Sequence, residues 1–116
     1  AEPEDVWAFP LPPSEPNFVT QGTAQGHVAF QDSPKESLKG AILLIPSADP
    51  GFDWVFSHRI AGFVTMYGGV NSHMAIRAAE LGIPAVIGAG QALYDNWAEA
   101  NTLELDCVGR RVRVVR

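Results

Sequence analysis

Residues 62–88 read GFVTMYGGVNSHMAIRAAELGIPAVIG, and this stretch decides the fold. It opens with the short apolar run Gly62–Met66, which is typical of a strand covered on both faces. A glycine turn leads into a helix predicted over Ser72–Leu81, and Gly82 suits the position that follows a helix. Ala85–Gly88 is again short and apolar. Because crossover connections are right-handed, the stretch predicts two parallel strands joined by one helix.

The flanking sequence adds a third buried strand and hairpins at both ends. Ala41–Ile45 is continuously apolar, as a central parallel strand is. A short helix is expected over Trp54–Arg59, with Asp53 as its N-cap. β-hairpin segments are expected on both sides of this core, within residues 17–31 and 102–115. The predicted fold class is therefore α/β, with a parallel central sheet and β-hairpin additions.

Composition places the chain among globular proteins of one domain. Its 116 residues are 47% hydrophobic and 18% charged, and no apolar run approaches the roughly 18 residues that span a bilayer. The formal net charge of −5 argues against a nucleic-acid groove and against an electrostatic membrane patch. Cys107 is the single cysteine, so an internal disulfide is excluded and a cytoplasmic location is expected.

The N-terminus differs in composition from the rest of the chain. Five of the nine prolines fall within residues 1–16, a density that no helix tolerates. We expect this segment to be an extended linker or a docking arm, and its acidic start is unlike a secretory signal peptide. Residues 17–116 are then the domain itself.

The loop between the first strand of the quoted stretch and its helix carries the candidate chemistry. Gly68 and Gly69 allow backbone conformations that turn amides toward a ligand, and Asn71 or Ser72 can cap the helix. His73 then lies in the first helical turn, where the dipole disfavours imidazolium and keeps the ring nucleophilic. The same helix end stabilises an anion attached to that ring. The pattern therefore predicts a phosphohistidine.

Helical periodicity separates this histidine from the core. His73, Arg77 and Glu80 share one face of the predicted helix. The opposite face carries Met74, Ala75, Ala78, Ala79 and Leu81. Arg77 lies one turn from His73 and can pair with a phosphoryl group. The ordinary alternative stays open at this point, because a lone helical histidine is more often structural or simply exposed.

Other chemistries fit the sequence less well. No GxxxxGK[ST] or GxGxxG loop is present for direct nucleotide binding. Ser72 and His73 are adjacent on one helix and point about 100° apart, so they cannot form a nucleophile–base pair. Three histidines and two aspartates lack the close spacing of metal ligands: His27, His58, His73, Asp49 and Asp53. We therefore predict no metal site.

Residues 62–88 resemble the phosphohistidine, or mobile, domain of the PEP-utilising enzymes. That family includes phosphoenolpyruvate synthase, pyruvate phosphate dikinase, enzyme I of the sugar phosphotransferase system and rifampicin phosphotransferase. Its pattern runs approximately T-x-x-G-G-x-[TN]-x-H, followed by a tail similar to the ELGIPAVIG of residues 80–88. The resemblance extends upstream through Pro46–Phe56 and covers about residues 17–116. It implies a swivelling β/β/α domain.

The resemblance also assigns roles to individual residues. His73 would be the phosphoryl carrier and Thr65 the threonine that positions its imidazole. Gly68 and Gly69 match the loop glycines. Asn71 stands where threonine is commoner, and Ser72 occupies the variable position before the histidine.

Three positions depart from the family pattern. Met74 replaces a small residue, Arg77 replaces an aliphatic one, and Ala79 stands where the family has an arginine that supports the phosphorylated state. Position 77 is about 160° away from position 79 around the helix. We expect Arg77, on the face of His73, to take over the pairing with phosphate.

The implied function is that of a phosphoryl-carrier domain in a multidomain phosphotransferase. His73 would take phosphate from ATP or PEP and pass it to pyruvate, water or a small molecule held by another domain. The domain itself would need no cofactor, and alone it would be inactive. ATP and Mg would bind a partner ATP-grasp-like domain, and a PEP/pyruvate-type domain would hold the other site. The alternative is a non-catalytic swivelling or docking module that has lost the relay.

Overall fold

A seven-stranded sheet organises the molecule. The computed structural model describes residues 16–69 and 71–115. The strands lie in the order β1-β5-β4-β3-β2-β6-β7. Their bounds are β1 Asn17–Val19, β2 Thr23–Phe30, β3 Ile42–Ser47, β4 Gly62–Tyr67, β5 Ala85–Ile87, β6 Thr102–Asp106 and β7 Arg111–Val115. The helices are α1 His73–Leu81 and α2 Gln91–Ala98, with 3-10 helices η3 Lys35–Ser37 and η4 Pro50–His58.

The centre of the sheet is parallel, as the apolar runs predict. β3 pairs in parallel with β4, and β4 pairs in parallel with β5. β2 joins them as a fourth parallel strand beside β3. The C-terminal hairpin is confirmed by the antiparallel pairing of β6 with β7. The fold is therefore mixed α/β with a parallel centre.

The expected N-terminal hairpin is wrong. β1 and β2 do not pair with each other: β1 lies antiparallel to β5 at one edge, whereas β2 lies between β3 and β6. Long-range pairings of β2, with β6 and with β3, take the place of the local pairing with β1. The first half of β2 pairs with β6 and its second half with β3, so the sheet curls at this strand. Gly26 stands at the curl, where a Cβ would collide with the carbonyl oxygen of Gly40.

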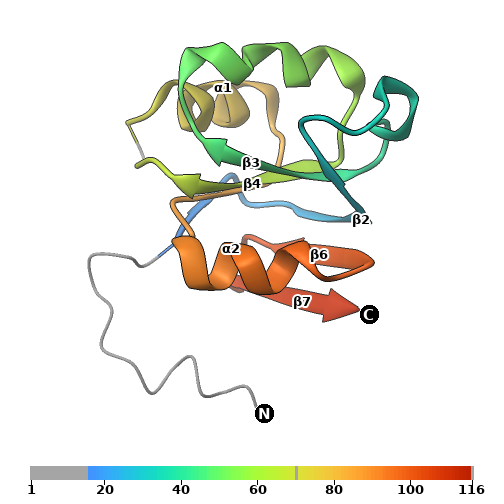
Figure 1. Cartoon of the computed structure of the whole chain (residues 1–116). Helices are drawn as coiled ribbons and strands as arrows, with labels where there is room; N and C mark the ends of the chain where they lie inside the picture. The colour runs from blue at the N-terminus through green and yellow to red at the C-terminus, as the bar shows by residue number, and fades with distance from the viewer. Residues whose placement is uncertain (1–15, 70, 116) are drawn as a thin grey trace.

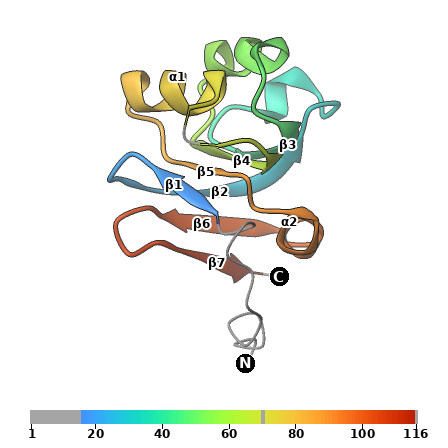
Figure 2. The same ribbon diagram turned by 90° about the vertical axis from the view of Figure 1, so that its left-hand side faces the viewer.

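The curl produces three layers. In Figures 1 and 2, α1 and η4 cover one face of the parallel strands, while α2 and the β6–β7 hairpin lie on the other. Side chains alternate between two buried clusters accordingly. Leu43, Ile45 and Phe63 pack toward α1 and η4. Ile42, Leu44 and Val64 pack toward α2 and β6.

Helix α1 matches its predicted bounds closely. Ser72 occupies the N-cap position, and Gly82 ends the helix in a left-handed conformation with φ of 71°. Its buried face is narrower than expected, since only Met74, Ala75 and Ala78 are buried. Ala79 is exposed and Leu81 is 47% exposed, because the helix presents a single stripe to the sheet.

The predicted cap of the preceding short helix is wrong. That helix is η4, a 3-10 helix that begins at Pro50, and Asp49 is its N-cap. The Asp49 carboxylate accepts a hydrogen bond from the Gly51 amide at 3.0 Å. Proline favours the first position of a helix, which moves the start upstream of Asp53. The Asp53 side chain is therefore not used as a cap.

The proposed N-terminal arm lies outside the described residues except for Pro16, so the division of the chain into an arm and a domain stays a prediction. Among the described helices, none combines the length and apolar character needed to cross a bilayer.

Candidate functional site

The candidate site lies where β3 and β4 end. Ser47 and Tyr67, the last residues of these two strands, are register partners. The chain then passes through Gly68 and Gly69 to α1, whose first residue is His73. The imidazole is neither in the core nor fully in solvent, since the side chain is 37% exposed. The predicted placement of His73 beyond the carboxyl ends of parallel strands is therefore confirmed.

One carboxylate oxygen contacts both candidate side chains of α1. Oδ1 of Asp53 lies 2.8 Å from Nε2 of His73 and 3.1 Å from Nε of Arg77. Arg77 also reaches Glu80, with Nη1 at 3.4 Å from Oε1. Its guanidinium carbon lies 5.6 Å from the ring centroid of Phe56 on η4. The predicted pairing of His73 and Arg77 on one face is confirmed, and a residue of η4 joins them.

Sequence reasoning missed the part that Asp53 has in this site. The residue was expected to cap a helix, and its contact with His73 spans 20 positions. The available signal was topological. Asp53 follows β3, His73 follows β4, and the carboxyl ends of neighbouring parallel strands meet at one edge of a sheet.

Electrostatics fix the direction of the hydrogen bond between these two residues. The hydrogen bond from His73, followed by that from Arg77, lowers the pKa of Asp53 below the ordinary value of 3.8. The carboxylate is therefore ionised near neutral pH and can only accept hydrogen bonds. It follows that Nε2 of His73 carries the donated proton.

The amides at the start of α1 are partly occupied. The Met74 N–H donates to the Ala48 carbonyl at 3.1 Å, and the Ser72 N–H donates to the Gly69 carbonyl at 3.0 Å. The Ser72 hydroxyl also donates to the Gly69 carbonyl, at 2.6 Å, instead of capping the helix. Asn71 is exposed in the turn. These two amides are thus not open to an anion, in contrast to the free helix end expected from sequence.

Thr65 organises the loop backbone. It is fully buried, and its hydroxyl donates to the Tyr67 carbonyl at 2.9 Å and accepts from the Gly88 amide at 3.0 Å. Neither bond goes to the imidazole of His73, so a direct positioning role for Thr65 stays a prediction. The two hydrogen bonds fasten the end of β4 to the segment after β5, immediately before Gly68.

The two loop glycines have different surroundings. Gly68 has a φ of 134°, and a Cβ there would lie 2.7 Å from the Cβ of Ala48. Gly69 has no atom within 4 Å of the corresponding position. The close approach of the loop to Ala48 therefore requires glycine at the first position, whereas the second faces open space.

The three departures from the family pattern fall in different places. Met74 is fully buried in the cluster under α1, so its larger side chain fills the core and not the site. Ala79 is exposed on α1. Arg77 alone among the three contacts the partner of His73.

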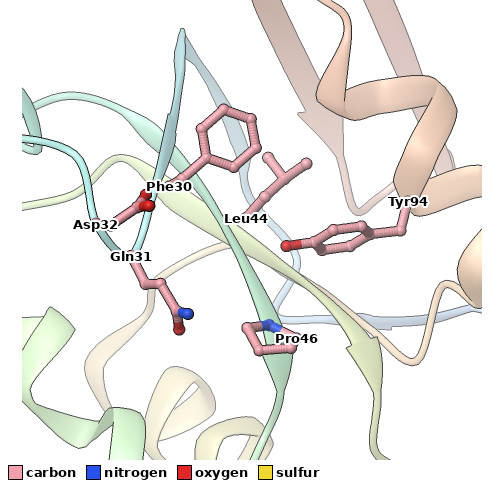
Figure 3. Close-up of a pocket in the computed structure, with 6 residues that line it drawn as sticks. All are labelled: Phe30, Gln31, Asp32, Leu44, Pro46 and Tyr94. Atoms are coloured by element: carbon pink, nitrogen blue, oxygen red, sulfur yellow. The ribbon is translucent and has the colours of Figure 1, made fainter.

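A separate pocket lies on the opposite face of the sheet. It has a volume of about 450 Å³ and is lined by Phe30, Gln31, Asp32, Leu44, Pro46 and Tyr94. Figure 3 shows the Tyr94 ring reaching from α2 toward β3. Burial raises the pKa of Tyr94, which keeps the phenol protonated. Leu44 belongs to the cluster under α2, so the sheet separates this pocket from His73.

Within residues 16–69 and 71–115, no three His, Cys, Asp or Glu side chains gather in a way that could hold a metal ion. The contacts described above build the site from an imidazole, a guanidinium and a carboxylate. The fold and this arrangement define a small α/β domain with a half-exposed histidine at the start of a helix.

Comparison with known proteins gives the family. The family described as "PEP-utilising enzyme, mobile domain" matches residues 38–109, which is more than half of the chain. The chain belongs to this family, as the glycine loop and the helix of His73 predict. It is therefore related to a family of phosphotransfer enzymes.

Curated relatives are much longer proteins. The chain is 35% identical over 114 residues to phosphoenolpyruvate synthase of Aeropyrum pernix, with 79% of this chain and 14% of the relative covered. It is 48% identical over 71 residues to phosphoenolpyruvate synthase of Aquifex aeolicus, covering 60% and 8%. It is 38% identical over 76 residues to rifampicin phosphotransferase of Streptomyces sviceus, covering 64% and 9%. The chain thus spans 14% or less of the length of these relatives.

A solved structure shares the fold. The solution NMR structure of a UPF0107 protein matches with a TM-score of 0.61 and 15% identity, covering 86% of this chain and 96% of that one. At this identity the likeness supports the fold alone.

Proposed function

We propose that this chain is a phosphoryl-carrier domain and that His73 is the carrier. The observation that supports this most strongly is the half-exposed imidazole at the first residue of α1, held beside Arg77 by Asp53, in a member of the mobile-domain family. A ring nitrogen attacks phosphorus of ATP or PEP, and the bond from phosphorus to the leaving oxygen breaks. The ring proton passes to solvent. The acceptor then attacks phosphorus and the phosphorus–nitrogen bond breaks.

Arg77 is the residue we assign to pairing with the phosphoryl group. Its Nε already points to the same oxygen atom as His73 Nε2, which keeps the guanidinium beside the imidazole. A phosphoryl group on that ring lies within reach of a side chain four residues along the same helix face. Arg77 would thus supply the positive charge that the family has at the position of Ala79.

The donor and acceptor sites belong, in this proposal, to other domains of a longer protein. The described site holds no nucleotide-binding loop, and the relatives are many times longer than the chain. We propose an ATP-grasp-like domain that binds ATP and Mg, a PEP/pyruvate-type domain, and a swivelling movement of this domain between them. The isolated chain is then inactive. The lone Cys107 suits a cytoplasmic setting.

A second candidate is a non-catalytic swivelling or docking module. Two observations favour it: Arg77 is already paired with Asp53 and Glu80, and the position of the family arginine holds an exposed alanine. In such a module Arg77 would serve only to fasten α1 to η4. The two candidates differ in whether the protein forms a phosphohistidine.

The test is to incubate the full-length protein with ATP labelled at the β or γ position, or with labelled PEP. The carrier proposal expects an acid-labile, alkali-stable label that disappears in His73→Ala. His27→Ala is the matched control, because that imidazole is exposed on β2 and its Nε2 lies 2.6 Å from the Ser37 carbonyl. Loading that survives in His73→Ala contradicts the assignment of His73 as the carrier. Loading that is absent with every donor contradicts the carrier proposal and supports the module.

A further inference from the structure

We propose that Asp53 is a positioning residue that sets the balance between unloaded and loaded His73. Its carboxylate stabilises the unloaded imidazole through Nε2 and opposes a phosphoryl group at the same place, so it favours delivery of the phosphoryl group over storage. This inference rests on the proposed carrier function.

The nitrogen at the outer end of the ring is the one that contacts Asp53, and it is also the one we propose to be loaded. In histidine, Nδ1 is bonded to Cγ, the ring carbon attached to Cβ, whereas Nε2 lies at the outer end of the ring. An outer nitrogen is the more accessible one to a bulky donor bound by another molecule or domain. Here Nε2 is the atom that lies 2.8 Å from Asp53 Oδ1. Loading at Nε2 first requires its proton to move to Nδ1 or to solvent, because a protonated ring nitrogen has no lone pair for attack. The nitrogen–phosphorus bond then forms as the bond from phosphorus to the leaving oxygen breaks, and the hydrogen bond to Asp53 is lost.

Charge gives the second half of the argument. A hydrogen bond to an ionised acceptor is about twice as strong as a neutral one, so the unloaded state is stabilised. A phosphoryl group on Nε2 brings negative charge to the position that the donated proton occupied, directly opposite the carboxylate. Like charges at that separation repel, so the loaded state is destabilised. Both effects move the equilibrium in one direction, toward transfer to the acceptor.

The position of Asp53 in the fold separates this role from the capping of its own helix. Asp49, and not Asp53, caps η4, so the Asp53 side chain is not needed to start its own helix. The Asp53 carboxylate contacts side chains of α1, at His73 and Arg77. Its side chain is 43% exposed, which leaves room for an isosteric amide without disturbing the core.

The test measures the loaded fraction of the full-length protein at a fixed ratio of donor to product. Asp53→Asn keeps the shape, removes the charge and retains a weaker acceptor. We expect the ratio of loaded to unloaded protein to rise roughly fivefold, because a charged acceptor is exchanged for a neutral one. We also expect slower discharge of the phosphoryl group. Asp53→Glu restores the charge and returns the ratio toward that of the unchanged protein. Glu36→Gln, an exposed acid on η3, controls for net charge and leaves the ratio unchanged.

A loaded fraction that falls or stays constant in Asp53→Asn overturns the inference. If the label is lost in His73→Ala but the Asp53 variants have the same loaded fraction as the unchanged protein, the carrier function stands and this inference is refuted.

Imidazole ¹⁵N chemical shifts of the unloaded protein supply a measurement that needs no loading. We expect the Nε2-protonated tautomer alone, which gives way to a mixture of tautomers in Asp53→Ala and persists in Glu36→Gln. A mixed tautomer in the unchanged protein overturns the inference even if no donor labels it.

Discussion

Nε2 of His73 and Nε of Arg77 meet at the same oxygen atom, Oδ1 of Asp53, at 2.8 and 3.1 Å. The two side chains come from successive turns of α1, whereas the carboxylate comes from η4, which follows the neighbouring strand. This shared acceptor joins a candidate nucleophile to a candidate phosphate ligand before any phosphoryl group arrives. The consequences can be tested residue by residue.

Removal of Arg77 tests the relocated phosphate partner. Arg77→Ala should lower the rate of phosphoryl transfer through His73 by about tenfold or more, because a charge-assisted hydrogen bond to the phosphoryl group is lost. The measurement is the rate of label uptake from ATP or PEP. Arg113→Ala, a change to an exposed arginine on β7, is the matched control. Equal rates for Arg77→Ala and the unchanged protein would refute the relocation.

Acid should remove the contribution of Asp53 to stability. Because its pKa is lowered in the folded protein, the stabilisation is present above the ordinary value of 3.8 and is lost as the pH falls through the lower folded value. Asp53→Asn should therefore be less stable than the unchanged protein at neutral pH, and the two unfolding curves should converge in acid. Thermal unfolding at a series of pH values measures this, and a difference that grows in acid contradicts it.

The two loop glycines should respond differently to alanine. Gly68→Ala should cost about 1–3 kcal/mol of unfolding free energy, because the residue has positive φ and the new Cβ would press on Ala48. Gly69→Ala should cost less, since nothing lies within 4 Å of the added atom. Denaturant unfolding of the two variants compares them directly. Equal losses would show that the approach of Gly68 to Ala48 does not constrain the loop.

Thr65 should matter through its hydroxyl. Thr65→Val keeps the shape but leaves the Gly88 amide and the Tyr67 carbonyl without their partner, at a cost of about 1–3 kcal/mol. Thr65→Ser, which retains the hydroxyl, should be closer to the unchanged protein. Unfolding free energies give the comparison. Similar stability of the valine and threonine proteins would contradict a role in fastening the loop.

The parts of the fold that depend on local pattern were predictable. Ala41–Ile45 and Gly62–Met66 are continuous apolar runs, and both form central parallel strands. Gly82 ends α1 because a glycine readily takes the left-handed conformation observed there. Periodicity also placed His73 and Arg77 on one face.

The parts that depend on distant contacts were not predictable. β1 pairs with β5, so Asn17 lies opposite Ile87, and no local signal distinguishes this arrangement from a hairpin with β2. The exposure of Leu81 depends on which single stripe of α1 faces the sheet. The position of Asp53 depends on the packing of η4 against α1, which the cap preference of aspartate obscures.

The central claim is that His73 carries a phosphoryl group, and the most direct measurement locates that group on the chain. The full-length protein is incubated with ATP or PEP, digested at alkaline pH and analysed by mass spectrometry. The account predicts a phosphoryl group on the peptide that contains His73, at that residue. Consumption of the donor with the phosphoryl group on another residue, or with His73 unmodified throughout, would contradict it.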